Sequence, residues 1–119
     1  MNIIGPLIQF VQQLRIFHWQ TDSYAQHQAF GRIYDALDDL SDTFVETYMG
    51  KFGRAKPTVT YQISLKSLTG PQVVDDVIAS FIEYLNSMSD HAEISSDLLN
   101  IRDSILGEVH TLKYLLTLK

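Results

Sequence analysis

The chain has 119 residues, of which 45% are hydrophobic and 19% charged, a length and balance that predict one folded domain and exclude a disordered chain. Its formal net charge of −5 argues against a nucleic-acid binder that works by neutralising phosphates. Cysteine is absent, which excludes disulfides, zinc–thiolate sites and cysteine nucleophiles. We see neither an apolar run approaching the roughly 20 residues that span a membrane nor the basic region of a signal peptide. We therefore expect a cytoplasmic protein with no membrane or nucleic-acid partner.

Apolar residues recur at helical spacing in the first half of the chain and predict two helices. The first covers about residues 3–20, with Pro6 in its first turn, where no amide donor is needed. The second covers about residues 23–50, where Ser23 and Gln26 match a capping box. The positions expected to be buried are Ile3, Leu7, Phe10, Val11, Leu14 and Phe17 in the first helix, and Phe30, Ile33, Leu37, Leu40 and Phe44 in the second.

Residues 52–70 break the helical period and predict an irregular or extended connection, with some strand character in residues 58–64. Pro71 then fits the first position of a third helix. Asp90 and Glu93 match another capping box, which predicts a fourth helix from there to the C-terminus. The expected buried positions are Val74, Val77, Ile78, Phe81, Ile82, Leu85 and Met88, then Ile94, Leu98, Ile101, Ile105, Val109, Leu112 and Leu116.

The lengths of the connections predict the topology. Short connections make the first two helices and the last two helices antiparallel pairs. The middle connection can reach roughly 60 Å, whereas the second helix is about 40 Å long. The connection can therefore run back along the bundle, so that helices two and three are parallel. We predict a single all-α domain over residues 1–119, a four-helix bundle with the one long crossover that is typical of ferritin-like folds.

Acidic residues line one side of the second predicted helix. Asp35, Asp39, Asp42 and Glu46 follow one another at spacings of four, three and four residues, and Asp38 lies beside them. This stripe is nearly opposite the apolar arc, so it does not support a di-iron site inside the bundle. Two interpretations stay open: a solvated acidic face, which is the common case, and a site shared between subunits. Repulsion of a few tenths of a kcal/mol per like-charged pair weighs against the solvated face.

Histidines stand at both ends of the stretch HWQTDSYAQH, residues 18–27. His18 lies at the edge of the first helix's apolar arc, and His27 lies between the apolar and acidic arcs of the second. Taken alone, each is typical of a core-edge or first-turn histidine. Ile16 and Trp19 lie off the apolar arc, where a single chain would expose them, and a large exposed apolar side chain often marks an interface.

Two stretches resemble the Dps-like mini-ferritins. LRIFHWQTDSYAQHQAFGRIYDALDDLSDTFVE is similar to their first half, and SSDLLNIRDSILGEVHTLKYLLTL to their last helix. The resemblance implies a ferritin-like fold and a metal site between two subunits. In that site His18 and His27 of one subunit would face Asp42 and Glu46 of another.

The same resemblance implies that the metal is iron, with zinc as an alternative occupant, and that the function is ferroxidase activity or iron storage. We expect Asp35 and Asp39 to lie nearby, either as outer-shell acids around the ligands or as acids at the entry to the site. A homo-oligomer, at least a dimer, would bury Ile16 and Trp19. The departures are a loop between the histidines that is three residues shorter, Gly31 where the family often has an acidic ligand, and no clear helix in the long connection. No basic tail is present, so the DNA binding of some members is not implied.

A closer resemblance is to a small uncharacterised group of proteins encoded largely by bacteriophages. The shared sequence motifs are FHWQT-SY--H and DTFVETYMGKFGR. This resemblance implies the alternative to metal binding: a ferritin-like helical scaffold or interaction protein without metal chemistry. Such a protein would act in phage assembly or host takeover, in the bacterial cytoplasm or in association with the virion. The solution mass and the metal content of one sample would separate the two functions.

Overall fold

The computed structural model describes residues 1–55 and 60–119, and these residues form helices and no strand. The elements are α1 (Gly5–Gln20), α2 (Tyr24–Phe52), α3 (Pro71–Ser87), the short 3-10 helix η1 (Met88–Asp90) and α4 (Ser96–Leu115). The all-α class and the four predicted helices are therefore confirmed. No helix in the described part of the chain is long and apolar enough to cross a membrane.

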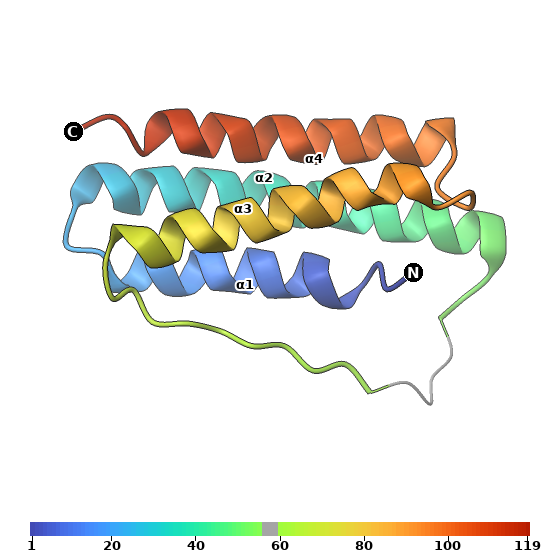
Figure 1. Cartoon of the computed structure of the whole chain (residues 1–119), viewed down its shortest axis with the longest axis horizontal. Coiled ribbons are helices and arrows are strands. Elements are labelled where there is room, and N and C mark those ends of the chain that lie inside the picture. Colours follow the sequence, from blue (N-terminus) through green and yellow to red (C-terminus); the bar gives the residue numbers. More distant parts are fainter. Residues whose placement is uncertain (56–59) are drawn as a thin grey trace.

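The helices form a bundle in which the connection after α2 returns along the outside (Figure 1). As a result α3 starts at the same end as α2 and runs parallel to it, while α1 and α4 run the other way. α2 packs against α1 and α4, and α3 packs against the same two helices. The long crossover predicted from the length of the connection is present.

The turn between α1 and α2 is closed by a relay of hydrogen bonds. Ser23 Oγ accepts from the Gln26 amide at 3.2 Å, as the capping box predicts. The Ser23 amide, however, donates to Thr21 Oγ1 at 3.1 Å, and the Thr21 hydroxyl donates to Gln26 Oε1 at 2.7 Å. The second half of the capping box therefore runs through Thr21. α2 continues past Gly50 and is capped by Gly53, whose φ of 89° favours glycine.

The predicted start of α4 is wrong. Asp90 ends the 3-10 helix η1, and α4 begins at Ser96, with no capping box formed by Asp90 and Glu93. The physical reason is burial, since Met88 and Ile94 both insert into the core and the chain between them must turn to reach it. Sequence periodicity does not distinguish this turn from a first helical turn.

The core follows the predicted apolar stripes. All six positions predicted in α1 and its approach are buried, and Phe10 stacks on Phe81 of α3 with ring centroids 3.9 Å apart. Phe17 packs on Phe30 of α2 at 5.6 Å. Five predicted core positions are only partly buried, namely Leu40, Val77, Ile82, Ile101 and Leu116.

Residues 60–69, called the strap below, are extended and are held against α1 by glutamine side chains. Gln13, only 2% exposed, accepts from the Lys66 amide at 2.7 Å and donates to the Lys66 carbonyl at 2.8 Å, much as a neighbouring strand would. Two more strap amides donate to glutamines of α1, Ser64 to Gln9 at 3.0 Å and Leu68 to Gln20 at 2.6 Å.

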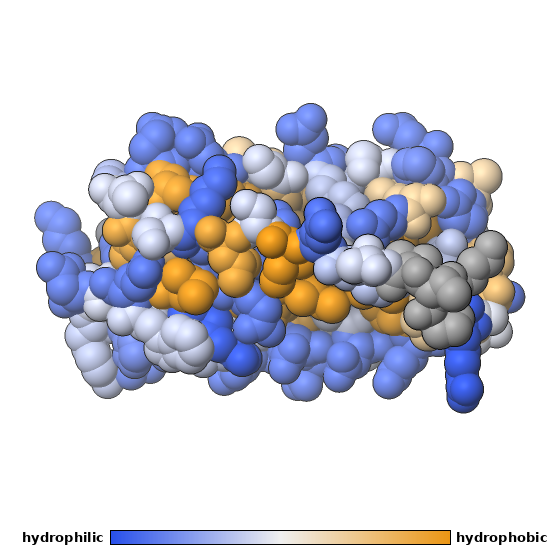
Figure 2. All heavy atoms as spheres, turned by 90° about the horizontal axis from the view of Figure 1, so that it is seen from below, coloured by the Kyte–Doolittle hydropathy of each residue, from blue (hydrophilic) through white to orange (hydrophobic). Residues whose placement is uncertain are grey.

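Some strand character was predicted in residues 58–64. The described residues 60–64 form an extended chain without a strand partner. Residues 58 and 59 lie outside the described part. Figure 2 shows the molecule from the side that carries the strap, and apolar side chains gather along this face.

Candidate functional site

The rings of His18 and His27 stack on one another at the turn between α1 and α2. Their centroids are 3.7 Å apart and their planes differ by 15°. His18 Nδ1 is 2.6 Å from the His27 carbonyl oxygen, and His27 Nδ1 is 2.8 Å from the His18 carbonyl oxygen. Because a carbonyl only accepts, each Nδ1 must carry the proton. In the neutral rings both lone pairs therefore reside on the Nε2 atoms, where a metal could bind.

Gly31 makes room for this pair. A Cβ at position 31 would lie 2.9 Å from Cε1 of His18 and 3.1 Å from its Nδ1. The His18 ring thus fills the space that a side chain there would need. Position 31, where the mini-ferritin pattern often has an acidic ligand, cannot carry one while His18 keeps this orientation.

Tyr34 of α2 and Arg15 of α1 continue the ring contacts of the histidine pair. The Tyr34 ring meets His18 edge-on at 5.4 Å, and the Arg15 guanidinium lies 4.8 Å from the centre of the Tyr34 ring. Arg15 Nε is buried and finds no hydrogen-bond partner among the described residues. Sequence reasoning missed both residues, although Arg15 lies three positions before His18 on α1, and Tyr34 lies three after Gly31 on α2. The positive charge of the Arg15 guanidinium disfavours a metal ion at the histidines unless carboxylates compensate for it.

The predicted acids point away from the bundle, as their spacing indicated. Asp35, Asp39, Asp42 and Glu46 are all exposed, and no ion pair involves them within the described part of the chain. His27 and Asp42 are 15 residues apart on the same helix, which separates them by about 22 Å along its axis. Within the described residues of one chain, no three histidine, aspartate or glutamate side chains come close enough to hold a metal ion.

The structure thus brings the two histidines together and leaves the acids apart from them. A shared site would need acids from a second subunit, as the mini-ferritin resemblance implies.

The outer face of α1 and α2 combines apolar and acidic side chains. A groove of about 210 Å³ between the two helices is lined by Ile8 and Val11 on one side and by Asp38 and Asp42 on the other. Near the histidines, Trp19 is 67% exposed. Ile16 is half-buried. The expectation that a neighbouring subunit covers Ile16 and Trp19 stays a prediction.

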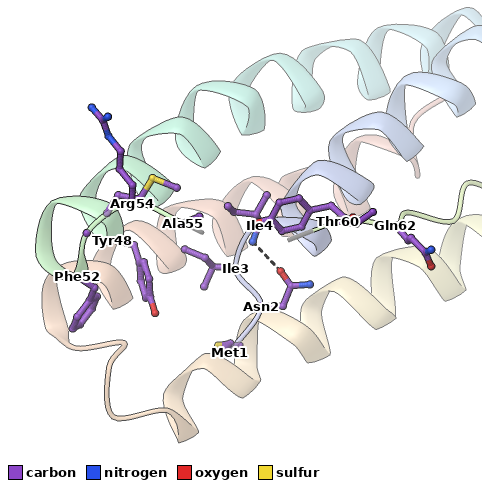
Figure 3. Close-up of a pocket in the computed structure, with 13 residues that line it drawn as sticks. Met1, Asn2, Ile3, Ile4, Tyr48, Phe52, Arg54, Ala55, Thr60 and Gln62 are labelled. Carbon is purple, nitrogen blue, oxygen red and sulfur yellow. Dashed lines mark hydrogen bonds between the residues drawn. The ribbon is translucent and has the colours of Figure 1, made fainter. Parts of the chain in front are cut away.

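A larger pocket, of about 530 Å³, lies at the end of the bundle where α2 finishes (Figure 3). Tyr48 and Phe52 of α2 face the N-terminal residues Ile3 and Ile4 across it, while the Arg54 side chain extends away from the other lining residues. Its described lining contains no carboxylate and no histidine. The described residues of this pocket therefore offer neither an acid–base pair nor a metal ligand set.

These observations define the class of protein: it is an all-helical bundle with a stacked histidine pair at its first turn. The chain belongs to DUF5856, a family of unknown function, whose sequence model matches residues 18–116. It is also 32% identical over 117 residues to an uncharacterized 14.6 kDa protein in the mobD–ri intergenic region of Enterobacteria phage T4. The aligned residues cover 98% of this chain and 86% of the phage protein. No solved structure matches the chain. These matches support the resemblance to phage proteins, and they add nothing in favour of a mini-ferritin.

Proposed function

We propose that this protein is a phage-type, ferritin-like protein that binds a divalent metal between two copies of itself. One observation carries the proposal: the reciprocal hydrogen bonds of His18 and His27 fix both Nδ1 atoms as donors and leave both Nε2 atoms free. A histidine that binds a metal nearly always donates its other ring N–H in this way, often to a backbone carbonyl. The pair is thus oriented as ligands would be.

The stacking limits how the pair can bind metal. The lone pair of each Nε2 lies in its own ring plane, and the planes are nearly parallel at a centroid distance of 3.7 Å. The two lone pairs therefore cannot converge on one ion at the 2.0–2.1 Å that a metal–imidazole bond requires. Each histidine would hold a different ion, or only one of them would bind. Asp42 and Glu46 of a second subunit, four residues apart on one helical face, would complete the site.

Nitrogen and carboxylate ligands of this kind suit ferrous iron, and zinc is an alternative occupant. If two ferrous ions are bound, they would be the substrate of a ferroxidase. Binding should weaken as the pH falls through the range in which imidazole takes up a proton, because the proton competes for Nε2.

A protein-binding scaffold without metal chemistry is the second candidate. Arg15 favours it, because its guanidinium contacts the Tyr34 ring that meets His18, and this positive charge opposes a bound cation. The exposed Trp19 and the apolar side of the α1–α2 groove also fit a surface that works by protein contacts.

Calorimetry with zinc, or with ferrous ion under anaerobic conditions, separates the two. We expect the wild type to bind, and Glu46→Ala to weaken binding by at least about tenfold, because one carboxylate ligand is lost. Glu83→Ala is the matched control, since Glu83 is an exposed acid on α3, and it should bind as the wild type does. Negligible heat from the wild type would leave the scaffold function standing.

A further inference from the structure

Arg15 lacks a partner for its charge within one copy of the protein. It is the only arginine of α1, and that helix contains no Asp, Glu or Lys. Its guanidinium lies on the Tyr34 ring, 4.8 Å from the ring centre, and it forms no ion pair with a described residue. Its Nε is buried without a hydrogen-bond partner among those residues. A guanidinium is best satisfied by a carboxylate, which can accept from two of its N–H groups at once.

An unpaired carboxylate lies on the same outer face, one turn farther along α2. Asp38 follows Tyr34 by four residues, about 6 Å along the helix axis. It is exposed and lines the groove between α1 and α2, yet it forms no ion pair with Arg15 or with any other described residue. Arg32 lies on the other side of α2, where it lines a pocket with Leu115 of α4. The α1–α2 face therefore has a positive level at Arg15 and a negative level beginning at Asp38.

This face is complementary to itself when a second copy is turned end for end. In a two-fold contact each residue that touches the second copy is touched by the same residue of that copy's matching patch. If Arg15, which lies at the level of Tyr34, meets Asp38 of a second copy, the two α2 helices must run antiparallel. The two-fold axis then passes close to Ala36. Both copies contribute one cation and one carboxylate, so two identical ion pairs form.

The same axis suits the histidines. An antiparallel contact centred near Ala36 sets His27 opposite Val45 of the second copy, between Asp42 and Glu46. These are the two acids that the proposed metal site requires. The unpaired charges and the histidine pair are different observations, and one arrangement of two copies fits both.

We propose that Arg15 binds Asp38 of a second copy, and that the two symmetric ion pairs hold the α1–α2 faces together before any metal binds. The two guanidinium groups also offset the repulsion between the Asp35 carboxylates, which lie near the axis in both copies. Pairing neutralises the positive charge close to the histidines, so it no longer opposes a cation there. The inference rests on the two-copy arrangement of the proposed function, and it does not depend on the metal.

The test measures the dimer dissociation constant of the whole protein by sedimentation equilibrium in the presence of EDTA. Arg15→Glu and Asp38→Arg each place like charges in both contacts, and each should weaken the dimer by at least about tenfold. Lys113→Glu is the matched control, because it makes the same change of charge at an exposed position of α4. It should dimerise as the wild type does. Circular dichroism checks that each variant keeps its helices.

Mixing the two weakened variants shows whether the pairing is between copies. In a heterodimer of Arg15→Glu with Asp38→Arg, both contacts join opposite charges. The mixture should therefore dimerise about as strongly as the wild type, which an ion pair within one chain cannot produce. The inference is overturned if the mixture stays monomeric, if either variant alone dimerises like the wild type, or if the wild type dimerises only with zinc. Zinc calorimetry on the same samples tests the metal separately: a rescued mixture without zinc binding would support the ion pairs and refute the metal alone.

Discussion

His18 and His27 stack where they do because position 31 of the facing helix has no side chain. The identities of the two histidines and of Gly31 can be read from the sequence, but the sequence does not indicate that the ring of one occupies the space left by the other. The glycine at position 31 and the stacking of the rings are therefore one structural fact. The hydrogen bonds that fix the ring tautomers go to backbone carbonyls, and no residue pattern marks these acceptors.

Replacing Gly31 with alanine tests this packing. A Cβ there would lie 2.9 Å from His18 Cε1, so the ring must move, and overpacking of this kind costs about 1–3 kcal/mol. The matched control is Gly107→Ala on α4, where a Cβ meets nothing within 4 Å. The control should gain up to about 1 kcal/mol from helix propensity. We expect urea unfolding to rank Gly107→Ala above Gly31→Ala; equal gains would mean that the pair moves freely.

Arg102 is a buried cation that the periodicity of α4 does not predict, because it lies among apolar core positions. Its guanidinium donates to the Leu85 carbonyl at 2.8 Å, near the end of α3, and to Ser89 Oγ at 3.0 Å. Arg102→Ala should lower the free energy of unfolding by about 2 kcal/mol, because a buried carbonyl loses a charged donor. Asp103→Ala removes only its exposed partner and should change the value little. Denaturant titration of the two variants measures the difference.

The four helices could be predicted because each buries one apolar stripe, and the crossover because its length exceeds that of α2. The strap was less predictable. Gln13 is a polar residue in the core face of α1, and its hydrogen bonds to Lys66 reach 53 positions along the chain, farther than any local pattern. The prediction for the start of α4 failed for a related reason, because the buried residue Ile94 belongs to a turn and not to a helix.

Gln13→Ala should release the middle of the strap. It removes two hydrogen bonds to Lys66, and we expect a loss of about 1–2 kcal/mol in the free energy of unfolding, together with faster amide exchange at Lys66. Gln12→Ala is the control, because no described residue hydrogen-bonds to the Gln12 side chain. A strap that stays protected in Gln13→Ala would contradict its dependence on this side chain.

The end of α2 and the start of α4 are joined by an ion pair. Lys51 Nζ lies 2.8 Å from Asp97 Oδ1, and its hydrogen bond is the main cause that lowers the pKa of the Asp97 carboxyl. A lowered pKa in the folded state adds stability above the unfolded pKa, about 3.9, and this stability is lost as the pH falls through the folded value. Asp97→Asn should therefore be less stable than the wild type at pH 6. Thermal unfolding near pH 2 should show the two converging, and a constant gap would argue against the ion pair.

At the scale of the whole molecule, the outer face of α1 and α2 is where a second copy is expected. It carries Trp19 near the histidines and the apolar–acidic groove farther along. The predicted link between the histidines and the acids rests on the resemblance to mini-ferritins, because Asp42 lies about 22 Å from His27 along α2. Periodicity places each residue on a face of its own helix, and it does not show which faces meet between subunits.

Sedimentation should show a dimer for the wild type, and Trp19→Ala should shift it toward monomer because the interface loses its largest apolar side chain. Tyr114→Ala is the matched control, as it removes an exposed aromatic from α4. Added zinc should strengthen the wild-type dimer by mass action. A monomeric wild type, with or without zinc, would count against the shared metal site.

The outer crossover also decides where the chain ends lie. Because α1 and α4 run in the same direction, the N-terminus and the C-terminus lie toward opposite ends of a molecule about 43 Å long (Figure 1). Proteins or labels fused to the two ends would thus be held on opposite sides of the bundle. Copies fused head to tail would follow one another as a rod, whereas closing the chain into a circle would require a linker that runs along most of the bundle.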